Sequence, residues 1–479
     1  RNYRDIEPYI ERVRRGRTEA LLGSGQRVLM FALTSGTTAK PKYIPVTEQT
    51  LAQWRQGWNV WGLKAILDHE GTLLRDIVQV TSPMHDHLSP SGIPCGAITG
   101  LLAETQKRLV RRYYVAPLEV SEIRDSAAKY YTIMRLAITR DVAFMVTANP
   151  ATLLRLARAA DENREQIIRD VRNGSLWPDI PVSSAIRRAL EPRMRPRPER
   201  ARQLEQCIDK HGGLYPAHYW RLGFRAHWTG GTMGLYESQL PTYFGQAPVR
   251  DIGLLASEGR MSIPLEDGTA SGVLAVAGQF FEFIPAEEYG ASNPTLLRSH
   301  EVSVGHQYFL IITNSSGLYR YDLGDRVRVT GRLGEAPLIQ FLSRDAHTSS
   351  LTGDKLTEDQ VVLAMGRIAR SECENVSSFV LAPRWDDPPR YRLYAEPADG
   401  ELAERLDTAL REINLEYESK RVSRRLGPIE LTVLPMGALA ERDRRLRAAK
   451  SRTVEQYKHQ YLLTKPGSDD ELAGVAERP

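Results

Sequence analysis

A run of small and hydroxyl residues ending in two lysines is the first feature of this 479-residue chain that could do chemistry. It reads Thr34-Ser-Gly-Thr-Thr-Ala-Lys-Pro-Lys42 and follows an apolar stretch, 28–33, with the composition of a strand. Backbone N–H groups and hydroxyls in such a turn can surround a phosphate chain, and the ammonium groups can neutralise it. The spacing differs from that of a Walker A loop. A phosphate-binding loop and a Ser/Thr-rich surface turn both fit this segment taken alone.

Three further segments carry residue types suited to a nucleotide. Trp228-Thr-Gly-Gly-Thr-Met-Gly234 follows a strand-like run, and its glycines would let the backbone approach a flat ligand closely. Leu254-Leu-Ala-Ser-Glu258 ends an apolar run with a hydroxyl and a carboxylate, which together can hold a phosphate oxygen and Mg²⁺. Tyr319-Arg-Tyr-Asp-Leu-Gly-Asp325 ends in a Gly-Asp turn whose carboxylate can bridge two ribose hydroxyls. Each segment alone also fits an ordinary structural turn.

Strand-like runs and helical periodicity alternate along the first part of the chain. Strand patterns occupy 28–33, 76–81 and 142–147, and helical spacing occupies 53–69 and 150–172. Such alternation is typical of α/β layering. The fold class that we expect is therefore α/β, with β-sheets flanked by helices.

The pattern of strand-like and helix-like runs changes twice further along the chain. Short strand-like runs separated by turn signals dominate from 225 to 344, and helix-like and strand-like runs mix again after 344. We therefore expect a large N-terminal domain, 1–344, and a smaller α+β C-terminal domain, 345–479, with the boundary near Arg344-Asp345.

Composition narrows the class of protein. Apolar residues make up 42% and charged residues 26%, as in folded globular proteins, and no uncharged apolar run approaches the roughly 20 residues that span a bilayer. The net charge of +5 weakly favours anionic ligands, but the basic run 192–200 lacks the aromatic interleaving of a nucleic-acid surface. The three cysteines lie far apart without a CxxC pair, which fits a reducing compartment. We expect a cytoplasmic protein with no membrane or nucleic-acid partner.

The order of these motifs resembles the adenylate-forming superfamily of acyl ligases, and their details resemble the Gretchen Hagen family of acyl-acid amido synthetases. The resemblance covers most of the chain, 3–461, although the family's first few dozen residues are absent and the chain opens with Arg1 rather than Met. We therefore expect the chain to begin inside a longer polypeptide. The matching stretches are TSGTTAKPK at 34–42, SPSGIPCG at 89–96, WTGGTMG at 228–234, LLASEGRMSIP at 254–264, YRYDLGD at 319–325, SRD at 343–345, GDKLTE at 353–358 and QYK at 456–458.

The resemblance implies a role for each matching residue. Thr38, Glu258 and Lys458 are the expected catalytic residues, and Glu258 is also the expected Mg²⁺ ligand. Lys458 matches the C-terminal lysine that the superfamily brings to the α-phosphate during adenylation. The residues expected to bind ATP or AMP are Ser35, Gly36, Thr37, Thr38, Lys42, Gly231, Thr232, Ser257, Glu258, Asp325 and Arg344.

The implied activity is that of an ATP- and Mg²⁺-dependent ligase. It would activate a carboxylic acid as an acyl-adenylate and transfer the acyl group to an amine, most simply that of an amino acid. Positioning, Mg²⁺ and a fixed cation assist such attack on phosphorus, and no protein nucleophile is needed. Two half-reactions of different geometry imply a mobile small domain with its hinge at Arg344-Asp345. We expect the loop 89–96 and residues near Trp228 to line the acid pocket.

Departures from the family pattern leave alternatives open. Leu254 stands where an aromatic residue is frequent, Ala39 stands where glycine is common, and His459-Gln460 replaces Pro-Arg after the C-terminal lysine. Lys450 lies near enough to be a rival of Lys458. Two other functions therefore remain open. One is acyl transfer to a thiol of coenzyme A or a carrier protein, and the other is a non-catalytic homologue that only binds.

Overall fold

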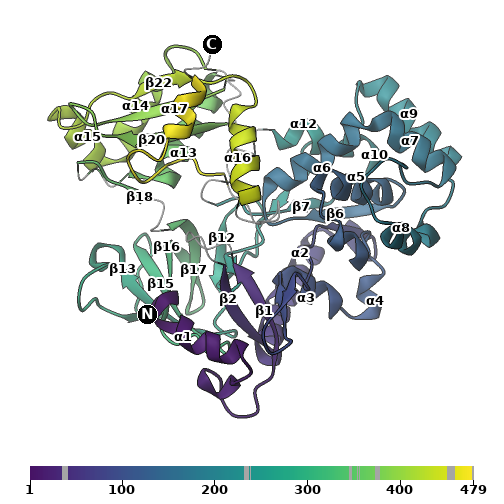
Figure 1. Ribbon diagram of the computed structural model, residues 1–479, viewed down its shortest axis with the longest axis horizontal. Coiled ribbons are helices and arrows are strands. Elements are labelled where there is room, and N and C mark those ends of the chain that lie inside the picture. The colour runs from purple at the N-terminus through teal and green to yellow at the C-terminus, as the bar shows by residue number, and fades with distance from the viewer. Residues whose placement is uncertain are drawn as a thin grey trace.

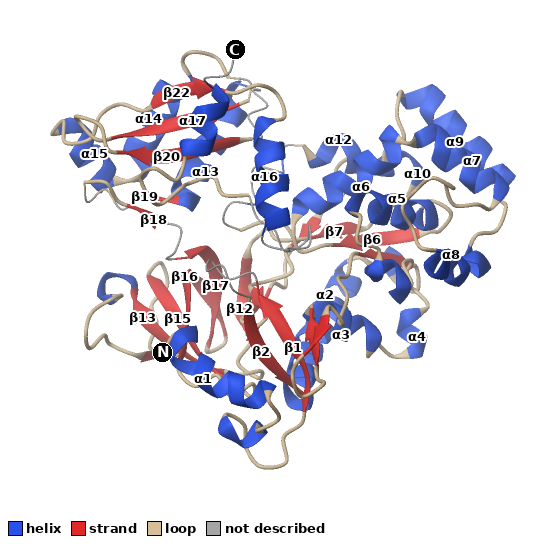
Figure 2. Cartoon of the chain, viewed as in Figure 1, coloured by secondary structure: helices blue, strands red, loops and turns tan. Residues whose placement is uncertain are grey.

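A computed structural model gives the fold of this chain. It describes residues 1–34, 41–230, 233, 237, 239–344, 348–352, 354, 356–372, 378–396, 398–449 and 459–476. Figure 1 shows a helix-rich part, a part built on antiparallel strands, and a C-terminal part that begins after β17. Figure 2 shows helices on the outside of the first part and strands at the centre of the second.

A four-stranded parallel sheet forms the centre of the helix-rich part. Its strand order is β3 (Asp76–Gln79), β6 (Val142–Val146), β7 (Phe224–Ala226) and β8 (Val249–Arg250). Every residue of β6 is buried, as expected for an apolar strand that is covered on both faces. The helices of this part include α2 (Glu48–Asp68), α3 (Ile98–Glu104), α4 (Arg108–Arg111), α5 (Ser126–Ala137), α6 (Pro150–Glu162), α7 (Arg164–Asn173), α8 (Ser184–Leu190), α9 (Pro198–His211), α10 (Pro216–Tyr219) and α12 (Leu240–Phe244).

The helix expected over 150–172 is in fact two helices, α6 and α7, which part at Asn163. The backbone of Asn163 leaves the helical region at φ −111° and ψ 26°, and its side chain donates to the carbonyl of Ala159 at 2.9 Å. Asparagine competes for backbone groups in this way, which makes it a poor interior helix residue. The hydrophobic spacing continues across the break, so the sequence pattern does not indicate it.

A seven-stranded antiparallel sheet forms the second part. The burial of β16 alternates along its length, as in a strand with one face on a core. The strand order is β11 (Ser262–Ile263), β12 (Ser271–Leu274), β17 (Ala336–Arg344), β16 (Tyr321–Leu333), β15 (Gln307–Thr313), β13 (Phe280–Pro285) and β14 (Leu297–Arg298). This sheet shares one hydrophobic core with a smaller sheet and with α1 (Tyr3–Arg14). The smaller sheet has the order β2 (Lys42–Thr47), β1 (Val28–Thr34), β5 (Pro94–Gly96) and β4 (His87–Leu88).

The C-terminal part has a separate core around a three-stranded sheet. Its strands are β20 (Phe379–Arg384), β21 (Arg390–Ala395) and β22 (Glu430–Val433), and its helices are α13 (Glu358–Glu372), α14 (Leu402–Ile413), α15 (Leu415–Val422), α16 (Ala438–Ala449) and α17 (Asp470–Ala476). Two short ribbons complete the fold: β9 (Leu255–Ala256) with β10 (Gly259–Arg260), and β18 (Thr348–Ser349) with β19 (Leu356–Thr357). Within the described ranges, no helix combines the length and apolar character that crossing a bilayer requires.

Candidate active site

Ser257 and Glu258 are the two turn residues of a tight hairpin. Strands β9 and β10 pair with Gly259 opposite Ala256, so the turn contains only these two residues. A two-residue connection fixes the direction of its side chains relative to the strands. The Glu258 side chain is nevertheless buried, with 6% of the residue exposed. The hairpin therefore carries a carboxylate into the interior of the protein.

Three charged side chains from separate elements gather around Glu258. Lys42 begins β2, Asp325 lies in β16, and Arg344 ends β17. Asp325 and Arg344 are direct partners in the β16–β17 ladder, and Arg344 Nε donates to Asp325 Oδ1 at 2.7 Å. The charges of all four groups act on one another. Four residues expected at the nucleotide site from distant parts of the sequence are thus brought together.

The pKa values in this cluster reflect a balance of burial and charge. Burial raises the pKa of Glu258, while the positive charges of Arg344 and Lys42 oppose that rise. Burial lowers the pKa of Lys42, and the charge of Arg344 adds to that effect. The carboxylate of Asp325 raises the pKa of Arg344. Two carboxylates and two cations in one site can hold a phosphate and a divalent cation together.

The N-terminal helix helps to position Lys42, a contact that the motif did not indicate. Tyr3, in α1, accepts a hydrogen bond from the backbone N–H of Tyr43 at 2.9 Å. The Lys42 ammonium lies 5.4 Å from the centre of the Tyr3 ring, within cation–π range. Tyr321 is buried nearby, and burial together with the charge of Glu258 raises its pKa.

A buried carboxylate, Asp251, fixes the backbone at Thr229, shortly after β7. Asp251 Oδ2 accepts hydrogen bonds from the N–H and hydroxyl of Thr229 at 2.6 and 2.7 Å, and Oδ1 accepts from Gly253 N–H at 2.6 Å. Trp228 Nε1 donates to the Gly253 carbonyl at 2.8 Å. Gly253 has φ +88°, and a Cβ there would lie 2.3 Å from the Ser262 carbonyl oxygen. Residues 228–229 and the segment 251–253, which precedes β9 and Glu258, are therefore tied to each other.

Several expected site residues lie outside the described part of the chain, and their roles stay predictions. They are Ser35, Gly36, Thr37, Thr38, Gly231, Thr232, Lys450 and Lys458, together with the hinge residue Asp345. Among the described residues, no group of three or more His, Cys, Asp or Glu side chains is placed to hold a metal ion.

A cavity of about 210 Å³ lies beside Glu258. Most of its wall is apolar and a few amide side chains interrupt it, which is the usual character of a small-molecule site. Neither the loop 89–96 nor Trp228, both expected to line the acid pocket, belongs to this wall. The lining residues are Thr50, Gln53, Trp54, Gln56, Gly57, Val60, Glu258, Gly259, Arg260, Ile263, Val273, Leu274, Ala275, Val276, Ala277, Gly278, Gln279 and Asn314.

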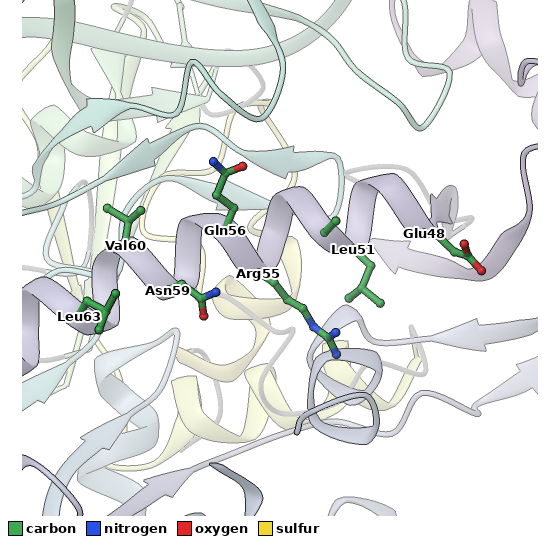
Figure 3. A pocket seen from close by; sticks show the side chains of 8 residues that line it. Glu48, Leu51, Arg55, Gln56, Asn59, Val60 and Leu63 are labelled. Carbon is green, nitrogen blue, oxygen red and sulfur yellow. The ribbon is translucent and has the colours of Figure 1, made fainter. Parts of the chain in front are cut away.

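A wider hollow of about 570 Å³ follows the outer face of α2, and all its lining residues come from that one helix. Figure 3 shows Gln56 and Val60 projecting to one side of α2 and Arg55 and Asn59 projecting to the other. Gln56 and Val60 also line the cavity beside Glu258. Because a single helix cannot enclose a ligand, the cavity is the better candidate for a substrate site.

The chain, with a large N-terminal and a smaller C-terminal part, has the fold of solved acyl acid amido synthetases. It matches the solved structure of "GH3.15 acyl acid amido synthetase" with a TM-score of 0.85 and 21% identity, covering 100% of this chain and 86% of that one. The "AtGH3.15 acyl acid amido synthetase in complex with 2,4-DB" gives a TM-score of 0.86 and 20% identity, with the same coverage. The fold class expected from the motifs is confirmed.

Family models match along the chain: the GH3 family N-terminal domain at 1–249, the central domain at 272–344 and the C-terminal domain at 359–467. The chain belongs to the GH3 family. It is 28% identical to "Jasmonoyl--L-amino acid synthetase GH3.5" of Oryza sativa subsp. japonica, over 92% of this chain and 81% of that protein. It is 25% identical to "Indole-3-acetic acid-amido synthetase GH3.10" of Arabidopsis thaliana, over 92% and 80%. The expected activity is confirmed at the level of class: an acyl-acid amido synthetase, a ligase that forms amides.

Proposed function

We propose that this ligase activates a carboxylic acid with ATP as an acyl-adenylate, releases pyrophosphate, and passes the acyl group to the amine of an amino acid. The single observation that carries the proposal is the convergence of Lys42, Glu258, Asp325 and Arg344 in one buried site. Relatives named for joining acids to amino acids support the choice of acceptor.

Each described residue of the site has a distinct task in this proposal. Lys42, the last residue of the segment 34–42, neutralises phosphate charge. Asp325 accepts hydrogen bonds from ribose hydroxyls, and Arg344 holds the Asp325 carboxylate in place from the neighbouring strand. Glu258 has the carboxylate that would hold Mg²⁺, and the ion would neutralise charge on the α-phosphate oxygens. Ser257, Gly231 and Thr232 complete the nucleotide site.

The two half-reactions need different groups at the α-phosphate. We assign Lys458 to adenylation, with Thr38 beside it, and treat Lys450 as the rival for the same task. The proposed domains are 1–344, which holds ATP and the acid, and 345–479, which carries Lys458. Rotation about the boundary near Arg344-Asp345 would remove the lysine before the amine attacks.

We assign the acid to the cavity beside Glu258. The reacting carboxylate must reach the α-phosphate while the rest of the acid is kept away from water, and the cavity offers an apolar wall that includes Glu258 itself. A cytoplasmic location is part of the proposal, and the sparse, unpaired pattern of cysteines supports it.

Pyrophosphate release tests the proposal directly. A panel of carboxylic acids is supplied with ATP and Mg²⁺, and amino acids are then added singly, with amide products followed by mass spectrometry. Acid-dependent release that disappears in Asp325→Ala and in Lys458→Ala is the expected result. Acid-dependent consumption of coenzyme A without amide would indicate transfer to a thiol. Failure to bind ATP by calorimetry would indicate a non-catalytic homologue.

A further inference from the structure

One face of α2 lines the cavity beside Glu258. Thr50, Gln53, Trp54, Gly57 and Val60 recur at spacings of three and four residues, so they share one side of the helix. Most of the opposite wall is apolar. A hydrogen-bonding side chain on the helical wall can therefore decide which ligands fit, because few polar groups are available to satisfy it.

Two of the four amide side chains in the cavity wall are already occupied by other protein groups. Asn314 donates to the main-chain carbonyl of Glu258 and contacts Gln279 Oε1 at 3.4 Å. Gln279 Nε2 donates to the carbonyl of Arg260 at 3.2 Å. These side chains therefore fix the hairpin and leave little capacity for a ligand. Gln56 lines the outer hollow as well as the cavity, so bulk water can satisfy its amide.

Gln53 differs from these amides. Its Oε1 accepts a hydrogen bond from the hydroxyl of Ser315 at 2.9 Å, and Thr50 in turn contacts the Ser315 hydroxyl at 3.0 Å. This arrangement directs the carbonyl end of the amide to Ser315 and leaves the NH₂ end free. Within the described part of the chain, Gln53 Nε2 has no hydrogen-bond partner. Two N–H donors thus remain available to a ligand or to water, in a cavity whose wall also includes the Arg260 guanidinium, with its Nη1 unpartnered among the described residues.

We propose that Gln53 selects acids whose apolar body carries an acceptor oxygen, such as a hydroxyl, keto or ether oxygen. The inference rests on the proposed function, because it takes the cavity as the acid site. An acid with such an oxygen satisfies the Gln53 amide. A hydrocarbon acid of the same shape displaces water from the Gln53 amide and offers no hydrogen-bond acceptor in its place. Sites built around a hydrogen bond reject analogues that lack it far more strongly than apolar pockets reject a missing methylene.

Matched pairs of acids, measured by calorimetry without ATP, test the proposal. The probes are phenylacetate with 3- and 4-hydroxyphenylacetate, and octanoate with 7-oxooctanoate and 8-hydroxyoctanoate. The wild-type protein should bind at least one oxygenated acid about 10- to 100-fold more tightly than its hydrocarbon partner, the cost of leaving a donor unpaired. Gln53→Met keeps the length of the side chain and should bring that ratio close to one.

Gln53→Glu sharpens the test, because a carboxylate accepts hydrogen bonds but does not donate them. This variant should lose the preference for the keto acid and retain a preference for a hydroxy acid, whose O–H can donate. Asn59→Leu is the matched control, since Asn59 projects from the other side of α2, and it should leave every ratio unchanged. Thermal unfolding of each variant checks that the fold is retained.

The outcomes separate this inference from the proposed function. Three results would overturn the proposed role of Gln53. They are equal binding within every pair, a preference that survives in Gln53→Met, and no binding of any of these acids. Pyrophosphate release is measured in parallel with the same acids. Release without an oxygen preference would leave adenylation standing and reject the role of Gln53. A preference that depends on Gln53 without pyrophosphate release would support the role of Gln53 and reject adenylation.

Discussion

The side-chain amide of Asn314 donates a hydrogen bond of 2.7 Å to the main-chain carbonyl of Glu258, although 56 positions separate the two residues. Asn314 follows directly after β15, in the large antiparallel sheet, whereas Glu258 lies at the tip of a separate hairpin. The hydrogen bond therefore anchors the turn that carries the proposed Mg²⁺ ligand to the sheet that carries Asp325.

Removing this anchor should impair catalysis more than stability. Asn314→Ala should lower kcat/KM for ATP about 10- to 100-fold and raise the Mg²⁺ concentration needed for half-maximal rate, because a misplaced carboxylate holds the ion poorly. Pyrophosphate release against Mg²⁺ concentration measures the effect. Asn59→Ala, on the outer face of α2, is the control. An unchanged Mg²⁺ dependence in Asn314→Ala would show that the anchor does not position Glu258.

Replacing Asp325 should weaken nucleotide binding. The carboxylate is 1% exposed and holds Arg344, so Asp325→Asn replaces one of its two acceptor oxygens by an NH₂ group and removes the negative charge that faces a cation. Affinity for AMP should fall about 10- to 100-fold, as expected for losing charge-assisted hydrogen bonds. Calorimetry with AMP measures this. Glu282→Gln breaks the ion pair with Arg320 in the same sheet and should leave AMP affinity unchanged. Equal effects of the two substitutions would contradict the assignment.

The acid limb of the pH–rate profile should reflect the ionisation of Glu258. Burial raises its pKa above the ordinary glutamate value of about 4.3. As the pH is lowered, kcat/KM for pyrophosphate release should therefore begin to fall at a higher pH than an exposed glutamate would give. The positive charge of Lys42 lowers the pKa of Glu258, and removing that charge must raise it. Lys42→Met should therefore move the acid limb to higher pH, in whatever residual activity remains. A limb that moves to lower pH would exclude Glu258 as the titrating group.

The buried carboxylate of Asp251 should matter chiefly for folding. Asp251→Ala leaves the N–H groups of Thr229 and Gly253 without their acceptor in the interior. The free energy of unfolding should fall by about 2–4 kcal/mol. Asp251→Asn should cost less, because its amide oxygen can still accept one of these hydrogen bonds. Denaturant unfolding measures both variants, and a larger loss in Asp251→Asn would contradict the proposed role of the carboxylate.

The two C-terminal lysines should differ in one half-reaction only. Lys458→Ala should reduce acid-dependent pyrophosphate release at least about 100-fold, because a fixed cation at the α-phosphate is lost. It should retain amide formation from a chemically supplied acyl-adenylate, since the lysine has no task in that step. Lys450→Ala should leave both steps near normal. The opposite pattern would transfer the role to Lys450.

The residues proposed to bind the nucleotide could be singled out in the sequence because each belongs to a local pattern. Glu258 ends an apolar run, Asp325 ends a Gly-Asp turn, and Lys42 follows a hydroxyl-rich segment. Their partners could not be predicted in this way. Asn314 reaches Glu258 across 56 positions and Gln53 receives its hydrogen bond from Ser315 across 262, and no periodicity along the chain reports such tertiary contacts.

The cavity beside Glu258 could not be predicted from the sequence, for a related reason. Composition drew attention to the Pro- and Gly-rich loop 89–96, whereas the cavity runs along α2. The helical spacing over 53–69 was visible in the sequence, and α2 covers most of that range. One face of an amphipathic helix can pack against a core or line a cavity, and hydrophobic spacing does not distinguish the two.

Strand β2 runs directly into α2, with Thr47 ending the strand and capping the helix through a 3.1 Å hydrogen bond from Thr50 N–H. Lys42 and the wall that holds Gln53 are therefore parts of one continuous element, with the proposed phosphate contact at its start and the proposed acid contact on its helix. If binding of one substrate displaces this element, the binding site of the other substrate moves with it. Acid and ATP should then bind cooperatively, and thermodynamic reciprocity requires each to change the affinity of the other by the same factor.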